Sequence, residues 1–127
     1  MNLKELMMQF LREEGYCPKE TELGLDFKCE GRSFVFFYDS DDELYFRLMM
    51  PNIFEVTDEN RDAVMYALNE TNATVKVVKA YTPIPQYVWV GFEVLVDSTP
   101  VLSDLVPRGL SMLRTAQTTF YEAIQKG

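Results

Sequence analysis

Residues 86–96, with the sequence QYVWVGFEVLV, constrain the fold more than any other segment because alternate residues divide into one wholly apolar set and one mixed set. Successive side chains of a β-strand point to opposite faces, so every second residue shares a face. One face is wholly apolar and consists of Val88, Val90, Phe92, Val94 and Val96. The other face is mixed and consists of Tyr87, Trp89, Gly91, Glu93 and Leu95. This contrast predicts a central strand with a helical layer on one side of the sheet and a less uniform covering on the other.

The same reasoning divides the rest of the chain into helices and strands. Apolar residues at helical spacing predict helices over residues 2–14, from an N-cap at Thr57 or Asp58 to about residue 71, and from about residue 100 to the end. Alternation and turn residues predict four further strands, over residues 23–29, 33–38, 44–50 and 75–81. The predicted order is α-β-β-β-α-β-β-α. It corresponds to the α+β class, with a five-stranded antiparallel sheet packed against helices and its first three strands forming a meander.

Prolines and one glycine mark positions where these predictions depend on local geometry. Pro51 is expected to end the third strand, because proline cannot donate a ladder hydrogen bond. Residues 72–74 are expected to end the second helix. Pro107 either kinks the last helix or divides it into two pieces, and we expect the kink. Gly91 is expected to mark a bulge or twist, although a close-packed neighbour would also explain it.

Length and composition indicate one domain spanning residues 1–127. A chain of 127 residues with 47% hydrophobic and 25% charged residues can bury a substantial core. Cys17 and Cys29, without a signal-peptide pattern, predict free thiols in the cytoplasm. The net charge of −8 opposes binding to nucleic acid or to anionic membranes, so neutral or basic protein segments are the expected partners.

The residue types that carry most enzyme chemistry are absent or scattered. The sequence has no histidine, which removes the commonest general base and a common metal ligand. A carboxylate pair or a calcium loop could be read into Asp39, Asp41, Asp42 and Glu43, but turn chemistry favours a solvated turn. The six glycines form no phosphate-binding loop. We therefore predict a non-enzymatic protein without a cofactor or a metal.

Aromatic residues give the strongest indication of function. They occupy both faces of adjacent predicted strands, so those left uncovered by helices either complete a monomer core or meet a second subunit or a partner segment. The residues predicted to contact a partner are Phe37, Tyr45, Tyr87 and Trp89. This surface predicts a protein-interaction domain. The alternative is a small-ligand sensor with a pocket between the sheet and the last helix, lined by Met49, Met112 and nearby aromatic residues.

Three segments carry a resemblance to a known family. Residues 67–73 (ALNETNA) run into residues 75–81 (VKVVKAY), and residues 88–95 (VWVGFEVL) follow. Together with the element order, size and acidity, this pattern resembles the YbjN-like group of bacterial regulators, within the type III secretion chaperone-like fold. The resemblance implies a homodimeric α+β protein that acts as a chaperone-like or regulatory adaptor. It also implies a surface on which an extended segment of a partner protein binds, in part by β-strand addition.

Overall fold

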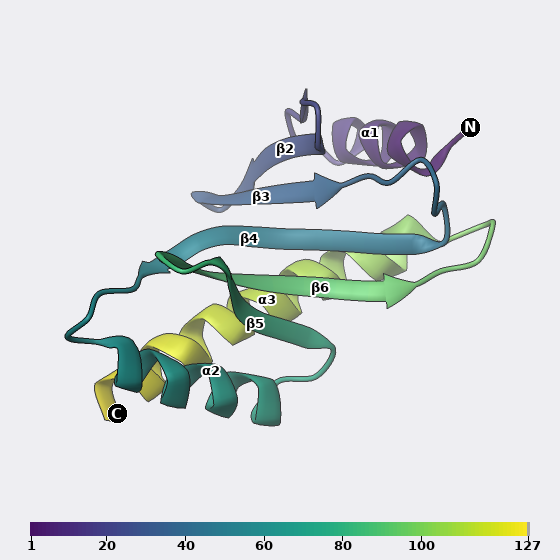
Figure 1. Cartoon of the computed structure of the whole chain (residues 1–127). Helices are drawn as coiled ribbons and strands as arrows, with labels where there is room; N and C mark the ends of the chain where they lie inside the picture. Colours follow the sequence, from purple (N-terminus) through teal and green to yellow (C-terminus); the bar gives the residue numbers. More distant parts are fainter. Residues whose placement is uncertain (127) are drawn as a thin grey trace.

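The computed structural model describes residues 1–126, in which three helices accompany a six-stranded antiparallel sheet (Figure 1). The strand order is β1-β2-β3-β4-β6-β5. The elements are α1 (Leu3–Glu13), β1 (Lys19–Glu20), β2 (Gly24–Cys29), β3 (Arg32–Phe37), β4 (Tyr45–Glu55), α2 (Arg61–Thr74), β5 (Val78–Ile84), β6 (Tyr87–Leu95) and α3 (Leu102–Lys126). The predicted α+β class and the antiparallel meander β2-β3-β4 are therefore confirmed, and the two-residue strand β1 accounts for the sixth strand.

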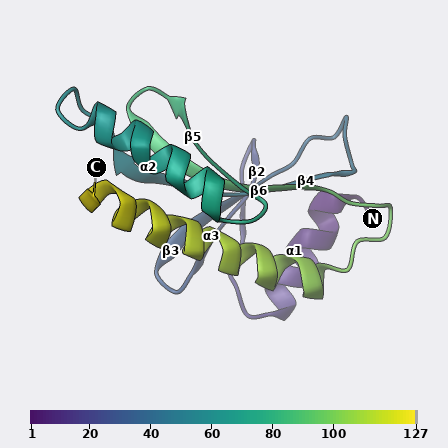
Figure 2. The same cartoon turned by 90° about the horizontal axis from the view of Figure 1, so that it is seen from below.

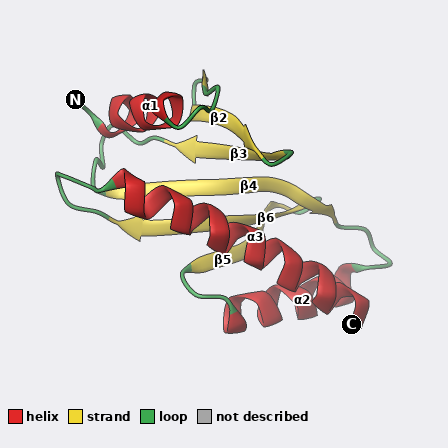
Figure 3. Ribbon diagram, turned by 180° about the vertical axis from the view of Figure 1, so that it is seen from behind, coloured by secondary structure: helices red, strands yellow, loops and turns green. Residues whose placement is uncertain are grey.

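The helices leave one face of the sheet uncovered. Figure 3 shows α3 crossing β4 and β6, whereas in Figure 1, seen from the opposite side, no helix lies in front of β3, β4 and β6. Figure 2 shows α2 beside α3, and α1 contacts both α3 and β2. The core between the helices and the sheet includes Met7, Leu11, Phe36, Phe46, Leu48, Val64, Val88, Leu113 and Phe120. Within residues 1–126, no helix has the length and apolar character needed to cross a membrane.

Strand β6 lies between β4 and β5, in the central position that its alternation predicts. Val88, Val90 and Phe92 are buried against the helices. Tyr87 and Trp89 point to the opposite face and are only half-buried. The predicted division of this strand into a core face and a mixed face is therefore confirmed.

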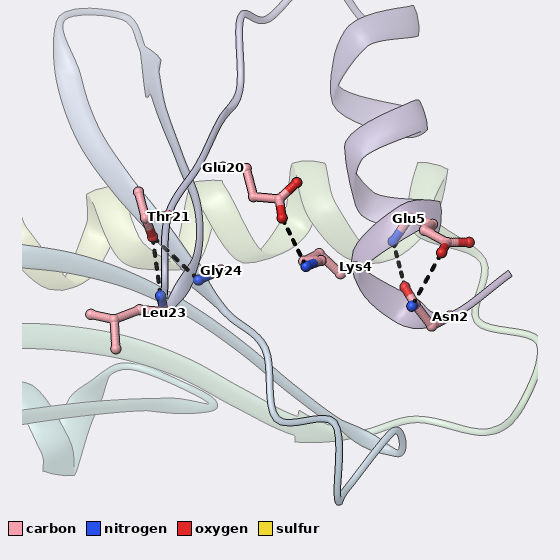
Figure 4. Close-up of polar contacts among 7 residues, drawn as sticks. All are labelled: Asn2, Lys4, Glu5, Glu20, Thr21, Leu23 and Gly24. Carbon is pink, nitrogen blue, oxygen red and sulfur yellow. Dashed lines mark hydrogen bonds and ion pairs between the residues drawn. The ribbon is translucent and has the colours of Figure 1, made fainter.

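Local polar contacts hold the first helix against the first strand (Figure 4). Asn2 begins α1, because its side-chain oxygen accepts a hydrogen bond from the backbone N–H of Glu5 at 2.8 Å. Lys4 Nζ lies 3.1 Å from Glu20 Oε2 and joins α1 to β1. Thr21 Oγ1 accepts a hydrogen bond at 3.3 Å from the first backbone N–H of β2 and so stabilises the turn between β1 and β2.

Strand β4 continues past Pro51, where the sequence predicted its end. The pairing of β4 with β6 shifts register between Met50 and Phe54, so Pro51 lies in an irregular part of the ladder. Asn52, the next residue, has a φ of 51°, in the left-handed region that asparagine tolerates. The prediction was wrong because a proline costs little at such an irregularity, where its missing N–H is not needed by the neighbouring strand.

The second helix begins later than predicted, at Arg61 instead of immediately after residue 57 or 58. Thr57 and Asn60 form reciprocal side-chain to backbone hydrogen bonds in the turn before this helix. The backbone N–H of Thr57 donates to Asn60 Oδ1 at 2.8 Å, and that of Asn60 donates to Thr57 Oγ1 at 3.3 Å. Such side-chain bonds stabilise a turn in place of the first helical turn.

The end of this helix also differs from the prediction. Residues 72–74, which were expected to break α2, are its last residues, and β5 starts at Val78 instead of residue 75. Val77 lies between them with a φ of 55°, a conformation that is rare for a β-branched side chain. The apolar pattern VKVV concealed this turn, because β-branched residues ordinarily indicate a strand.

The last helix begins at Leu102 and is unbroken through Pro107, so the alternative of two separate pieces is wrong. Pro107 lies in the second turn, where it removes a single backbone hydrogen bond from a long helix. Two residues later, α3 passes close to the sheet. A Cβ atom placed on Gly109 would lie 2.8 Å from Cδ2 of Phe92 on β6, so the missing side chain permits this approach.

Candidate functional site

The helix-free side of the sheet, which we call the open face, carries the four residues predicted to contact a partner. Cross-strand pairing identifies the side chains that share it, since Arg47 on β4 pairs with Phe37 on β3 and with Glu93 on β6. By alternation, the open face consists of Val35, Phe37, Tyr45, Arg47, Met49, Lys79, Tyr81, Tyr87, Trp89, Gly91, Glu93 and Leu95. The structure therefore brings the four predicted residues onto one surface and leaves them outside the helix-side core. Their role in binding stays a prediction.

Aromatic side chains meet across the middle of the open face. Phe37 on β3 and Trp89 on β6 stack over the intervening strand β4, with ring centroids 6.0 Å apart and planes inclined by 26°. The Arg47 guanidinium carbon lies 4.8 Å from the Phe37 ring centroid, within cation–π distance. Trp89 Nε1 donates a hydrogen bond of 2.9 Å to Asn52 Oδ1, which fixes the indole in place. A preformed aromatic platform results.

A carboxylate pairs with two cations beside these rings. Glu93 Oε1 lies 3.5 Å from Arg47 Nε and accepts a hydrogen bond from the Tyr45 hydroxyl. Its other oxygen, Oε2, lies 3.2 Å from Lys79 Nζ. The Glu93 side chain is only 12% exposed, and this burial raises the pKa of its carboxyl group above the ordinary value. The sequence alone did not identify this cluster, because its members come from three strands whose register it does not specify.

Gly91 provides space for a methionine on the open face. The β-ladder is regular at Gly91, so the bulge expected there is wrong, and the register shifts lie elsewhere. A Cβ atom on Gly91 would lie 2.6 Å from both Sδ and Cε of Met49. Met49 is fully buried although it does not belong to the helix-side core. The open face therefore has a small apolar centre of its own.

The β5 edge of the sheet is closed to strand pairing at its middle. Asn72, in the last turn of α2, accepts a hydrogen bond from the backbone N–H of Ala80 at 2.8 Å. Its side-chain Nδ2 donates to the Ala80 carbonyl at 3.0 Å. One amide side chain thus replaces the two bonds that an added strand would form. Sequence reasoning assigned Asn72 only to a helix end and missed this role.

The acidic turn serves the N-terminal helix. Glu43 Oε1 accepts a hydrogen bond from the backbone N–H of Leu3 at 2.8 Å, at the start of α1. Its Oε2 accepts from the Tyr38 hydroxyl, and this bond raises the pKa of Tyr38 to about 12. Asp39 Oδ1 accepts from the backbone N–H of Asp41 at 2.9 Å, as in a turn stabilised by its own side chain. Across residues 1–126, no three acidic or cysteine side chains are grouped in a way that could hold a metal ion.

The two thiols lie in different surroundings. Both cysteines are free, as predicted, and the structure leaves Cys17 exposed and Cys29 buried. The Tyr16 hydroxyl lies 3.3 Å from Cys29 Sγ, and this hydrogen bond, with burial, raises the pKa of Tyr16 to about 12. Cys29 is therefore part of the packing between the chain after α1 and β2.

A cavity of about 680 Å³ lies between the end of β6 and the first turns of α3. Phe92 and Met112 line it, in agreement with the predicted location between the sheet and the last helix. Met49, which was predicted to line the same pocket, lies on the open face against Gly91 instead. The error has a simple cause: in β4, Met49 and Met50 point to opposite faces of the sheet.

Comparisons with known proteins identify the fold. No protein-family model and no curated protein matches the chain. Among solved structures, a protein from Methanothermobacter thermautotrophicus described as uncharacterized matches with a TM-score of 0.66 and 12% identity, over 97% of this chain and 96% of that one. YbjN from E. coli, proposed to be a transcription regulator, matches with a TM-score of 0.68 and 14% identity, over 97% of this chain and 94% of that one. The chain therefore has a YbjN-like fold, as its sequence resemblance implied.

Proposed function

We propose that this chain is a non-enzymatic protein-interaction domain whose open face binds an extended segment of a partner protein. The stacked pair of Phe37 and Trp89, with Arg47 against it on a sheet face that no helix covers, carries this proposal. Tryptophan, tyrosine and arginine contribute most of the binding free energy in protein interfaces. A rigid aromatic platform also loses little conformational entropy on binding. A chaperone-like or regulatory adaptor uses such a surface.

The dimensions of the open face support the same proposal. Strand β4 has 11 residues and is about 36 Å long at ~3.3 Å per residue. Four neighbouring strands spaced ~4.8 Å apart span about 19 Å. Because β3, β6 and β5 have only 6, 9 and 7 residues, the four strands together cover about 520 Å², roughly two-thirds of the ~800 Å² that each partner buries in a standard interface. One segment of another protein, or a second copy of this chain, could cover it.

The open face is a better candidate than either edge of the sheet. At the β5 edge, the side chain of Asn72 already occupies the backbone groups of Ala80. At the other edge, β1 has only two residues. Binding by strand addition, which the family resemblance implied, would require these contacts to break. We therefore propose recognition through side chains, with a neutral or basic partner segment because the chain carries a net charge of −8.

The proposal is tested by partner capture from the source lysate with wild-type protein and two matched variants. Trp89→Glu places a charge on the open face, whereas Met65→Glu places the same charge on the exposed outer side of α2. Loss of a central aromatic contact costs at least ~2 kcal/mol, so affinity should fall by about thirtyfold or more. We expect a stoichiometric partner with wild type and Met65→Glu and none with Trp89→Glu.

Stability measurements separate lost binding from lost folding. Trp89→Glu removes a ring stack and one hydrogen bond, each worth ~1 kcal/mol. The free energy of unfolding should therefore fall by about 2 kcal/mol while the fold persists. A partner held equally by Trp89→Glu would contradict the proposal. Sedimentation velocity of the wild type tests whether the chain forms a homodimer. A dimer that persists in folded Trp89→Glu would show that the dimer interface lies outside the open face.

A further inference from the structure

The cavity beside β6 exists because the apolar face of this strand extends beyond the part that α3 covers. Val88, Val90 and Phe92 are buried, whereas Val94 and Val96, on the same face, are only half-buried. Figure 3 shows that α3 begins beside the C-terminal end of β6, after the loop of residues 96–101. The first turns of α3 leave a space of about 680 Å³ above these valines, within the usual size range of small-molecule sites.

The lining of the cavity carries two carboxylates and two cations, which differ in their local partners. Asp97 is hydrogen-bonded within its own loop, since its Oδ1 accepts a hydrogen bond from the backbone N–H of Thr99 at 2.9 Å. Asp104 lies in the first turn of α3, where the helix dipole stabilises a carboxylate. Lys76 and Arg108 also line the cavity, and neither side chain has an ion-pair or hydrogen-bond partner among the described residues. The unpaired hydrogen-bond donors among these four charged side chains are therefore those of Lys76 and Arg108, which leaves both free to bind an anionic group.

A strained turn forms part of the same lining. Val77 lines the cavity with a φ of 55° and a side chain that is 57% exposed. Holding a β-branched residue in the left-handed region costs ~1–3 kcal/mol, and such residues cluster at ligand sites. The turn places Lys76 and Val77 at the mouth of the cavity, next to the apolar wall formed by β6.

We propose that this cavity binds an amphipathic carboxylate, with its apolar body against Phe92 and Val94 and its anionic group at Lys76 and Arg108. The apolar body would complete the core face of β6, where the chain itself leaves Val94 half-buried. The two cations would supply charge-assisted hydrogen bonds to the carboxylate. This site is separate from the open face, so it does not depend on the proposed protein-binding function.

Three probes with the same alkyl chain test the proposal on the whole protein: octanoate, octanol and octyltrimethylammonium. Binding is followed by the methyl resonance of Met112, which lines the cavity, with the methyl of Met65 on the outer side of α2 as an internal control. We expect octanoate to shift only the Met112 signal and to bind about a hundredfold more tightly than octanol, because two charge-assisted contacts, each worth about tenfold, distinguish them. Octyltrimethylammonium should bind more weakly than octanol.

Variants test the two parts of the site separately. Arg108→Gln and Lys76→Gln should each lower octanoate affinity about tenfold and leave octanol affinity unchanged. Arg61→Gln removes a cation from α2, outside the cavity, and should change neither affinity. Val96→Phe fills the cavity and should abolish octanoate binding while the melting temperature is maintained or raised.

Three results would overturn the proposal. Equal binding of octanoate and octanol would show that the cations take no part. Absence of a Met112 shift with every probe would show that the cavity binds none of them. If the wild type sediments as a dimer that Val96→Phe dissociates, the cavity is covered by a second copy of the chain.

Discussion

Replacing Gly109 by alanine tests whether α3 packs directly on β6. The new Cβ atom would lie 2.8 Å from Cδ2 and 3.0 Å from Cε2 of Phe92. Carbon atoms in contact prefer separations of ~3.5–4.0 Å. Phe92 has little room to move away, because it packs edge-on to Phe46 with centroids 6.2 Å apart. The helix must therefore shift or the ring must leave its preferred rotamer.

The expected loss is the difference between two opposing effects. Overpacking a core by one methyl group costs ~1–3 kcal/mol, and a 2.8 Å approach to a ring that is held by Phe46 belongs to the upper half of that range. Alanine at a helix interior is favoured over glycine by ~1 kcal/mol, which offsets part of that cost. We therefore expect Gly109→Ala to lower the free energy of unfolding by about 1–2 kcal/mol. For a domain of this size the melting temperature should fall by about 4–8 °C.

Gly91→Ala is the matched control in β6. Its Cβ atom would meet the Sδ and Cε atoms of Met49, at 2.6 Å, and this flexible end can turn away on the open face. Its free energy of unfolding should change by less than ~1 kcal/mol, since alanine also lowers the entropy of the unfolded chain. Urea unfolding, followed by Trp89 fluorescence and by circular dichroism, measures the free energy of unfolding of both variants, and an unchanged m-value shows that the comparison is valid. A Gly109→Ala protein as stable as the wild type, or less affected than Gly91→Ala, would refute the close approach.

Two further predictions concern Asn72 and Glu93. Asn72→Ala removes both hydrogen bonds to Ala80, so the free energy of unfolding should fall by about 1–2 kcal/mol. The freed edge of β5 should also promote self-association, which sedimentation velocity detects. Thr74→Ala is the control: it loses one exposed hydrogen bond at the end of α2 and should show neither effect. Because burial raises the pKa of Glu93, the folded state holds its proton more tightly than the unfolded state, so the stability of wild type relative to Glu93→Gln should rise as pH falls through the folded pKa. A relative stability that falls over that range in urea unfolding would show that the two cations prevail over burial.

The faces of the strands could be predicted because alternation is a local property. In β6 the two faces differ in composition, and this pattern assigned Val88 to the core and Trp89 to the opposite face. In β3 both faces are apolar, so the side on which Phe37 lies required the structure. The helices followed from apolar spacing in the same way.

The remaining features depend on contacts between residues that are far apart in the sequence, which local patterns do not predict. Asn72 closes an edge only because α2 ends beside β5, and Glu93 meets Arg47 only in this strand register. Pro51 is tolerated within β4 because the ladder is irregular there. Each outcome was decided by tertiary contacts instead of local propensity. Tyr87 and Trp89 share a face by alternation within β6, whereas their position on the same face as Phe37 and Tyr45, and the polar residues between them, required the strand register that the structure shows.

The proposed binding face is tested most directly by methyl NMR of the protein labelled at its methionines. Met49 reports on the centre of the open face, Met112 on the cavity and Met65 on the outer side of α2. On titration with a partner captured by the wild-type chain, we predict a change in the Met49 resonance with Met65 unchanged. A bound partner that shifts Met65 or Met112 and leaves Met49 unchanged would contradict the assignment of the open face as the binding surface.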